Sequence, residues 1–317
     1  MTMLSRVAER LYWMGRYFER TEVVARLTSN YTHLIMDLPK KTAPEWLMLV
    51  RTLAVETSFF EHYRAANELN VLRFTLSELD NPCSIISSIK AARENVRTTR
   101  DVLPEELWEH VNELYLYARD QGEASVGRRM RHSFLDEIIA RCQMISGLLT
   151  NTLCRDHAMR FLKLGYLLER ADMTTRVIDV GSEAILSGDN KLESMQSLLW
   201  GNLLHSLSAM SAYRRLVSPI AEPQPMIQFL FKEPSFPRSF MFCLNGIQEA
   251  LHALNNNNQP LRAAHAALNK LNRLEDDSID LAQLHAFIDE LQSALIALHN
   301  SLSATWFQIP EMAQSQS

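Results

Sequence analysis

The sequence reads GRYFERTEVVAR at residues 15–26 and GYLLERADMTTR at residues 165–176. The two stretches share a glycine, a Glu-Arg pair, a second acidic residue and a final arginine, each 150 residues from its counterpart. What the two copies have in common is a set of charged residues on an apolar background, which packing alone would not preserve. The functional question therefore rests on the two Glu-Arg pairs.

The duplication continues downstream of these stretches. Tyr63-Arg64 and Tyr213-Arg214 keep the same offset, and beyond them the offset becomes 155 residues, as for Ser84 and Ser239. A repeat of this length is too long for a solenoid unit and predicts two helical halves related by an approximate two-fold axis. We expect residues 1–150 and 151–317 to form the two repeats, packed as one compact unit.

Composition and spacing predict helices throughout the chain. Its 317 residues include only 9 glycines against 14 methionines, and apolar residues recur at intervals of three and four without an alternating strand pattern. Stretches rich in glycine, proline and small polar residues predict breaks, among them residues 39–44, 121–127 and 187–190. The predicted fold class is all-α, a helical bundle built from two tandem repeats.

Two helix starts are predicted from their capping residues. Asn81-Pro82 is interpreted as an N-cap followed by proline at the first helical position. Residues 128–186 contain no glycine-proline break, and a single straight helix of that length would be too long for the domain. We therefore place a break near residues 151–156, with Asp156 capping the helix that carries the second motif.

Charge and cysteine usage narrow the class of protein. The net charge of −5 and the pI near 6.1 argue against a nucleic-acid-binding surface. The four cysteines are far apart and lack metal-ligand spacing, which is typical of reduced thiols in a cytosolic protein. The sequence contains neither a signal-peptide pattern nor an apolar stretch long enough for a bilayer. We expect a soluble, cytoplasmic protein that binds neither nucleic acid nor membrane.

The patterns typical of metal and cofactor sites are missing from the sequence. The ten histidines show no His-x3-His spacing of the kind that zinc sites use. No phosphate-binding glycine loop occurs, so the chain is not itself a nucleotide-binding ligase. We expect no metal and no cofactor.

The first motif places its charged residues on a helix that is apolar on both flanks. At 100° per residue, Gly15, Glu19, Glu22 and Arg26 fall on one stripe, and the second motif repeats the arrangement. A helix with apolar residues on both sides of a polar stripe is not a simple surface helix. The glycine four residues before each glutamate permits close approach of another backbone or of a ligand.

Ion pairs between residues four apart account for only part of this stripe. They would join Glu22 to Arg26 and Asp172 to Arg176, each contributing about 0.2–0.5 kcal/mol if exposed. A glutamate and the arginine that follows it point in different directions, so each needs a partner from elsewhere. In a first interpretation the motif helices cross and each glutamate pairs with an arginine of the other motif. Such a buried ionic lock would be retained for register or specificity rather than for energy.

In a second interpretation the same residues line a cleft between the halves. The arginines would then grip a carboxylate or phosphate, and a glutamate would act as base or amine acceptor. The catalytic candidates are Glu19 and Glu169. The candidates for binding a substrate or partner are Arg16, Arg20, Glu22, Arg26, Arg170, Asp172 and Arg176.

Two Pro-containing stretches at 81–84 and 236–239 are expected to begin helices. Helix N-termini offer free amides that bind anions, so Ser84, Arg238 and Ser239 are weaker candidates for an anion site. Capping of the helix by the serine hydroxyl explains the same pattern and is the favoured interpretation.

At these residues the sequence resembles the bacterial alpha-E family, an all-helical domain with a Glu-Arg motif that is usually found as a tandem duplication. The resemblance is carried by LSRVAERLYWMGR at residues 4–16, by Glu19-Arg20 and by residues 161–176, and it covers essentially the whole chain. Arg16 is not repeated, because Tyr166 stands in the second copy. Any role of Arg16 would therefore belong to one half only.

The resemblance implies a genomic setting rather than a measured activity. Members of the family are associated with circularly permuted ATP-grasp ligase-like proteins, transglutaminase-like peptidases and a proteasome-like peptidase, a setting interpreted as peptide synthesis, tagging or modification. The leading hypothesis is an accessory component without catalysis of its own, which binds a partner ligase or its peptide substrate. The alternatives are a peptide-modifying enzyme that uses the Glu-Arg motifs and a purely structural subunit.

Overall fold

The computed structural model describes residues 3–38, 45–186, 196–274 and 281–308. These residues form helices and connections, with no strand among them, so the predicted all-α class is confirmed. The breaks predicted at residues 39–44 and 187–190 fall outside the described residues.

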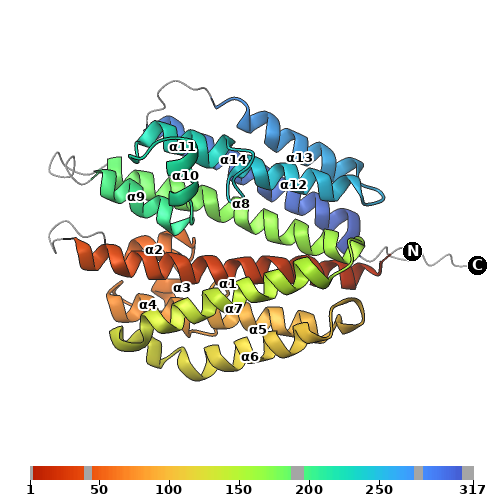
Figure 1. Cartoon of the computed structure of the whole chain (residues 1–317), viewed down its shortest axis with the longest axis horizontal. Coiled ribbons are helices and arrows are strands. Elements are labelled where there is room, and N and C mark those ends of the chain that lie inside the picture. Colours follow the sequence, from red (N-terminus) through yellow and green to blue (C-terminus); the bar gives the residue numbers. More distant parts are fainter. Residues whose placement is uncertain (1–2, 39–44, 187–195, 275–280, 309–317) are drawn as a thin grey trace, which may run out of the picture.

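Two long helices, α1 (Ser5–Asp37) and α8 (His157–Leu186), form the centre of the fold. They carry the two motifs and pack directly against each other. Figure 1 shows them crossing the middle of the molecule and running in the same general direction. Helix α1 also contacts α5, α7 and α9, so it is covered on several sides. This coverage explains why its sequence is apolar on both flanks of the polar stripe.

The first group of helices follows α1 in the chain. It comprises α2 (Leu47–Thr52), α3 (Glu56–His62), α4 (Glu68–Leu76), α5 (Ile85–Arg97), α6 (Glu106–Gln121) and α7 (Arg128–Thr152), with the short 3-10 turns η1 (Arg100–Val102) and η2 (Ala124–Val126). Helices α5 and α7 pack on α1, and α6 packs on both of them.

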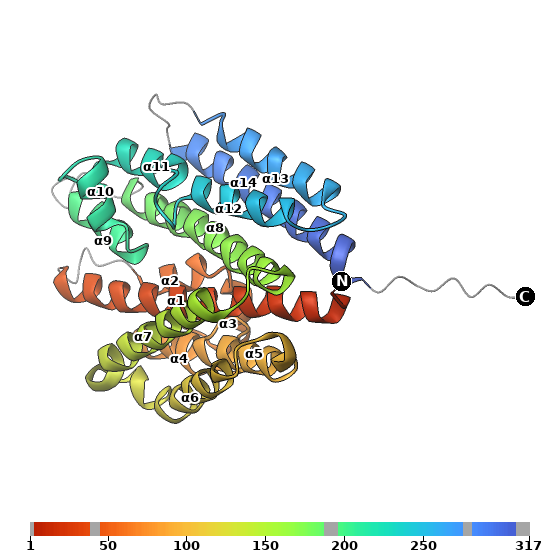
Figure 2. The same ribbon diagram turned by 45° about the vertical axis from the view of Figure 1, so that its right-hand side comes forward.

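The second group of helices follows α8. It comprises α9 (Gln196–Ser206), α10 (Met210–Leu216), α11 (Pro223–Lys232), α12 (Phe240–His252), α13 (Asn258–Leu271), α14 (Leu281–Leu302) and the turn η4 (Ser303–Phe307). Helices α12 and α14 pack on α8, and α13 packs on both. Figure 2 shows α4–α7 of the first group and the whole second group on opposite sides of the α1–α8 pair, and α2 lies against α8 as well.

Apolar side chains of both halves are buried in one continuous cluster. It includes Met14 and Ile89 from the first half and Leu164 and Leu244 from the second. Helices α5 and α12 both have 13 residues, and their bounds differ by 155 at each end, from 85 to 240 and from 97 to 252. The two-fold relation of the halves stays a prediction, as does their division at residue 150. That boundary falls inside the last turn of α7.

One of the two predicted helix starts is confirmed and the other is wrong. Helix α8 begins at His157, and the carboxylate of Asp156 accepts hydrogen bonds from the backbone N–H groups of Ala158 and Met159 at 2.9 and 3.4 Å. Helix α5 begins at Ile85 instead of Pro82. The Asn81 side chain is engaged in the preceding turn, where its Nδ2 donates to the Phe74 carbonyl oxygen at 2.8 Å.

None of the described helices is both long enough and apolar enough to cross a lipid bilayer.

Candidate functional site

The two motif glycines lie where α1 and α8 touch. A Cβ atom placed on Gly165 would stand 1.8 Å from the carbonyl oxygen of Tyr12, and one on Gly15 would stand 2.3 Å from that of Leu162. Both positions lack room for any side chain, because backbone fills the space. The close approach expected from the sequence is therefore made by the other motif helix. It brings residues one turn beyond the glycines face to face.

Glu169 of α8 receives two arginines from α1. Its carboxylate accepts a hydrogen bond from Arg16 Nε at 2.6 Å and a forked pair from Arg20 Nε and Nη2 at 2.6 and 3.1 Å. The Glu169 side chain is only 2% exposed. Two guanidinium groups thus neutralise one buried carboxylate.

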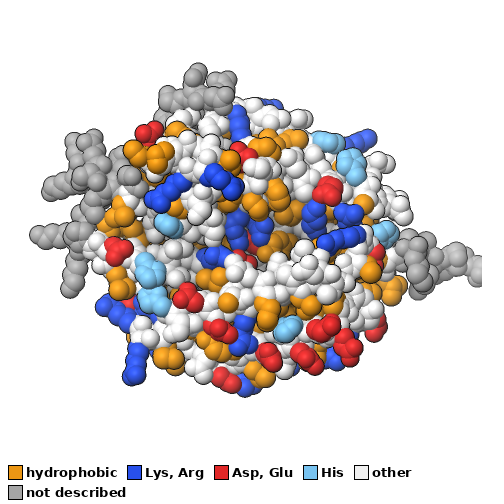
Figure 3. All heavy atoms as spheres, viewed as in Figure 1, with side chains coloured by type: hydrophobic (Ala, Val, Ile, Leu, Met, Phe, Trp, Pro, Cys, Tyr) orange, Lys and Arg blue, Asp and Glu red, His pale blue; other side chains and the backbone are white. Residues whose placement is uncertain are grey.

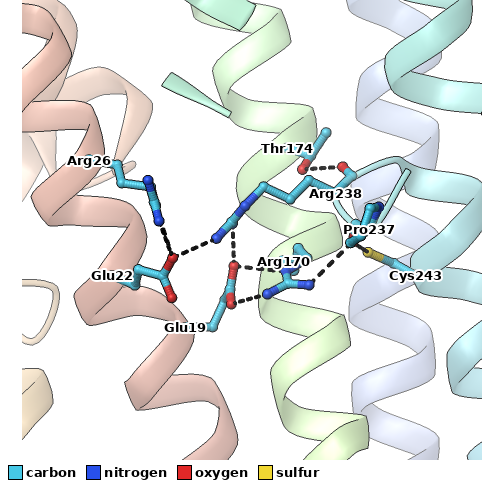
Figure 4. Close-up of polar contacts among 8 residues, drawn as sticks. All are labelled: Glu19, Glu22, Arg26, Arg170, Thr174, Pro237, Arg238 and Cys243. Atoms are coloured by element: carbon cyan, nitrogen blue, oxygen red, sulfur yellow. Dashed lines mark hydrogen bonds and ion pairs between the residues drawn. The ribbon is translucent and has the colours of Figure 1, made fainter. Parts of the chain in front are cut away.

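Glu19 of α1 receives two arginines from the second half of the chain. Arg170 of α8 makes a forked pair through Nε and Nη2 at 3.0 and 2.9 Å. Arg238, in the connection before α12, donates from Nη1 to the same carboxylate at 2.6 Å. Figure 4 shows both guanidinium groups converging on Glu19 from the side opposite α1. The Glu19 side chain is 0% exposed.

Backbone contacts hold Arg238 in place. Thr174 of α8 donates from Oγ1 to the Arg238 carbonyl oxygen at 3.0 Å, and Arg170 Nη1 donates to the Pro237 carbonyl oxygen at 3.2 Å. The connection before α12 is therefore tied to the second motif helix at two points.

The second acidic residue of each motif forms the expected pair four residues along its helix. Arg26 lies 2.8 Å from Glu22, and Arg176 lies 3.1 Å from Asp172. Arg238 also donates to Glu22 from Nη2 at 3.0 Å, so one guanidinium joins both acidic residues of the first motif (Figure 4).

These contacts match the first interpretation, in which the motif helices cross and exchange partners. We call the arrangement the Glu–Arg lock, meaning Glu169 with Arg16 and Arg20, and Glu19 with Arg170 and Arg238. Each side of the lock, with its neighbouring acid–arginine pair, holds three guanidinium and two carboxylate groups, an excess of one positive charge. The groups are Glu19, Glu22, Arg26, Arg170 and Arg238 on one side, and Glu169, Asp172, Arg16, Arg20 and Arg176 on the other.

Electrostatics keep both glutamates ionised. Burial acts to raise the pKa of the Glu19 carboxyl, but the guanidinium groups of Arg170 and Arg238 outweigh burial and lower it to about 2. Burial likewise opposes ionisation of Glu169, and Arg20 and Arg16 hold its pKa below the usual range. A carboxylate with so low a pKa, closed off from solvent, is a poor general base at neutral pH.

The lowered pKa values predict how stability depends on pH. A carboxyl whose pKa is lower in the folded state contributes stability that is complete above its unfolded pKa and is lost as pH falls toward the folded value. For Glu19 this window runs from 4.5 to about 2. Chemical denaturation across this range should show a smaller decline for Glu19→Gln than for the wild type. Identical declines would mean that Glu19 does not ionise as described.

One neighbouring contact was not anticipated from the sequence. The Tyr12 hydroxyl lies 2.7 Å from His299 Nδ1 of α14, and Arg16 Nη1 donates to the same hydroxyl at 3.4 Å. Burial raises the pKa of Tyr12 to about 12, so the hydroxyl stays protonated. This chain of contacts connects the Arg16 side of the lock to the end of the second half.

The three weaker candidates for an anion site have other partners. Ser84 and Ser239 cap α5 and α12, accepting hydrogen bonds from the backbone N–H groups of Ser87 and Phe242 at 3.1 and 3.0 Å. Their hydroxyls also donate to the carbonyl oxygens of Glu78 and Glu233. The guanidinium of Arg238 binds the carboxylates of Glu19 and Glu22. Arg238 was a weaker candidate for an anion site, and its place in the lock was not predicted from the sequence.

The caps should have a measurable effect on stability. We expect Ser84→Ala and Ser239→Ala each to lower the free energy of unfolding by about 1 kcal/mol, because a backbone N–H at the helix start loses its partner. Denaturant titration would measure this. Ser133→Ala, at an exposed position inside α7, provides a comparison for both variants. Equal stability of Ser84→Ala and the wild type would contradict the capping role.

The geometry was also compared with the needs of metal ligation and of a reactive thiol. The described residues contain no group of three or more His, Cys, Asp or Glu side chains that could hold a metal ion. The four cysteines are unpaired, and burial raises the pKa of the Cys243 thiol to about 12. A thiol with so high a pKa is a poor nucleophile.

Comparisons with known proteins connect this geometry to a family. A family model described as a predicted alpha-helical domain with a conserved ER motif matches residues 3–307. Glu-Arg dipeptides stand at the centre of the lock, at residues 19–20 and 169–170.

Curated relatives occur in mycobacteria. Uncharacterized proteins of Mycobacterium bovis and Mycobacterium tuberculosis are each 23% identical over 318 residues, covering 94% of this chain and 35% of their own length. The chain therefore spans about a third of the length of the curated relatives it matches. No solved structure gives a significant match.

Proposed function

The chain belongs to the Alpha-E family, and we propose that it is an accessory binding component of a peptide synthesis or modification system. It acts with an ATP-grasp ligase-like partner and binds either that ligase or its peptide substrate. In this proposal the Glu–Arg lock holds the two halves of the bundle in register and takes no part in bond making or breaking.

The main support for this proposal is that both motif glutamates are already paired with arginines of the same chain. Each is buried, and each is held by two arginines. The catalytic alternative requires one of these carboxylates to meet a substrate and accept a proton. The low pKa of Glu19 and the absence of exposed surface on it both favour a structural role.

Two further observations support a component that works beside other proteins. The mycobacterial relatives carry the matched region in chains about three times as long. The four cysteines are free thiols, which suits the reducing cytoplasm where an ATP-dependent ligase would act.

The proposal is tested by reconstitution with the neighbouring ATP-grasp ligase-like protein. The two purified proteins, mixed with and without ATP, should form a complex that size-exclusion chromatography with light scattering detects. A transglutaminase-like neighbour can be tested in the same way. The absence of any complex at micromolar concentration, with both proteins folded, would count against an accessory role.

A further inference from the structure

A cavity of about 190 Å³ lies between α1, α7 and α8, beside the Glu–Arg lock. Apolar side chains form most of its wall, among them Phe18, Leu149 and Leu162. An apolar cavity of about 150 Å³ accommodates a benzene molecule. This cavity therefore has room for one aromatic or branched aliphatic side chain.

One buried polar group faces the cavity and has an unused acceptor. Glu22 lines the cavity and is only 4% exposed. Both of its arginine partners bind Oε1, and no described residue donates a hydrogen bond to Oε2 (Figure 4). A carboxylate oxygen has lone pairs for more than one donor. Oε2 can therefore accept a hydrogen bond from a molecule that fills the cavity.

The surrounding charge favours an uncharged donor. Glu22 and Glu19 lie among the three guanidinium groups of Arg26, Arg170 and Arg238, which leaves an excess of one positive charge. An ammonium group would increase this excess. A backbone amide N–H supplies a hydrogen bond without a charge. Glu22 is thus suited to a peptide amide.

A second polar group stands at the edge of the cavity. Lys163 lines it and pairs with Glu249 at 2.6 Å, with side chains 29% and 65% exposed. An exposed ion pair of this kind contributes about 0–1 kcal/mol, so another carboxylate can replace Glu249. Figure 3 shows one face of the molecule, where Asp and Glu side chains lie mainly along the lower edge and Lys and Arg side chains are spread over the rest.

We propose that this cavity binds the apolar C-terminal residue of a peptide. The side chain of that residue enters the apolar space beside Phe18 and Leu149, its amide N–H donates to Glu22 Oε2, and its terminal carboxylate binds Lys163. This inference rests on the proposed function, because it names the part of the peptide that the accessory component holds.

Calorimetry or NMR titration of the full chain with small probe molecules tests the proposed ligand chemistry. N-acetyl-leucine carries the apolar side chain, the amide N–H and the carboxylate, and it is expected to bind. N-acetyl-leucine amide lacks the carboxylate, and hexanoate lacks the amide, so each should bind about tenfold more weakly. No saturable binding of N-acetyl-leucine at millimolar concentration would overturn the proposal. Hexanoate binding as tightly as N-acetyl-leucine would overturn the contact with Glu22.

A short peptide ending in leucine separates a peptide terminus from a free acyl amino acid. It should bind at least as tightly as N-acetyl-leucine, since both present the same terminal residue. Binding of N-acetyl-leucine without binding of the peptide would overturn the assignment of a peptide as ligand.

Variants locate the binding in this cavity. Ser146→Leu places a larger side chain on the wall contributed by α7 and should abolish binding of N-acetyl-leucine. Gly147→Ala, on the same helix with nothing within 4 Å of the added Cβ, should leave it unchanged. Lys163→Met should weaken the binding of N-acetyl-leucine about tenfold and leave the binding of N-acetyl-leucine amide unchanged. Equal loss for both probes would overturn the carboxylate contact.

Failure of this inference can be told apart from failure of the proposed function. Binding of the probes does not require the ligase partner, and complex formation with the ligase does not require the cavity to be filled. A complex without probe binding overturns the cavity assignment alone. Probe binding without a complex overturns the partnership.

Discussion

We expect the Gly165→Ala variant to lose about 3 kcal/mol of unfolding free energy. The added Cβ would stand 1.8 Å from the Tyr12 carbonyl oxygen, and rotation of a side chain cannot relieve a contact with backbone. Helices α1 and α8 must move apart, which also lengthens the arginine–glutamate contacts one turn away. Urea denaturation of the variant and the wild type measures the loss.

Gly147→Ala provides the matched control for this substitution. It lies within α7, and no atom is found within 4 Å of the added Cβ. Alanine in an open helical position stabilises by about 0.5–1 kcal/mol relative to glycine. The two substitutions should thus change stability in opposite directions. Similar behaviour of the two variants would mean that α1 and α8 do not meet at Gly165.

The second large effect is expected from Glu19→Gln, which should lower the free energy of unfolding by about 3–5 kcal/mol. The substitution keeps the shape of the side chain but removes the charge that Arg170 and Arg238 share. Two guanidinium groups, with side chains only 12% and 10% exposed, would then face each other without a carboxylate between them. Thermal or chemical denaturation measures the effect.

An exposed ion pair supplies the control for Glu19→Gln. Glu94 pairs with Arg97 at 2.6 Å, and both side chains are about half exposed. Glu94→Gln should change stability by less than about 1 kcal/mol, because solvent replaces the lost partner. A loss in Glu19→Gln no larger than in Glu94→Gln would contradict a buried lock.

The sequence predicted those features of the site that follow from helix geometry. Gly15 and Gly165 precede their glutamates by one turn, which places a close approach next to a charge. Glu19 and Arg20 are adjacent and point apart, so that partners had to come from another helix. Both arguments use only local spacing, and the structure shows the resulting contacts.

The place of Arg238 could not be predicted in the same way, because it depends on how the connection before α12 folds back onto α8. A signal was nevertheless present. Arg16 has no counterpart in the second motif, where Tyr166 stands. Glu169 pairs with two arginines of the first motif, whereas the second motif offers Glu19 only one equivalent arginine. The second partner of Glu19 therefore had to come from outside the motifs.

Some helix ends also gave no signal in the sequence. Helices α2 and α3 are separated at Ala54, and α9 and α10 at Ser208, where φ is 54° and 53°. Residues other than glycine and asparagine rarely adopt this left-handed backbone. Neither position is a glycine or proline, so these interruptions depend on tertiary packing.

A double-mutant cycle between Glu169 and Arg20 tests the central claim most directly. The two side chains belong to different motif helices and meet in a forked pair at 2.6 and 3.1 Å. The unfolding free energies of Glu169→Gln, Arg20→Met, the double variant and the wild type give the coupling between them. A buried lock across α1 and α8 predicts a coupling of about 2 kcal/mol. A coupling below about 0.5 kcal/mol, as for an exposed pair, would contradict it.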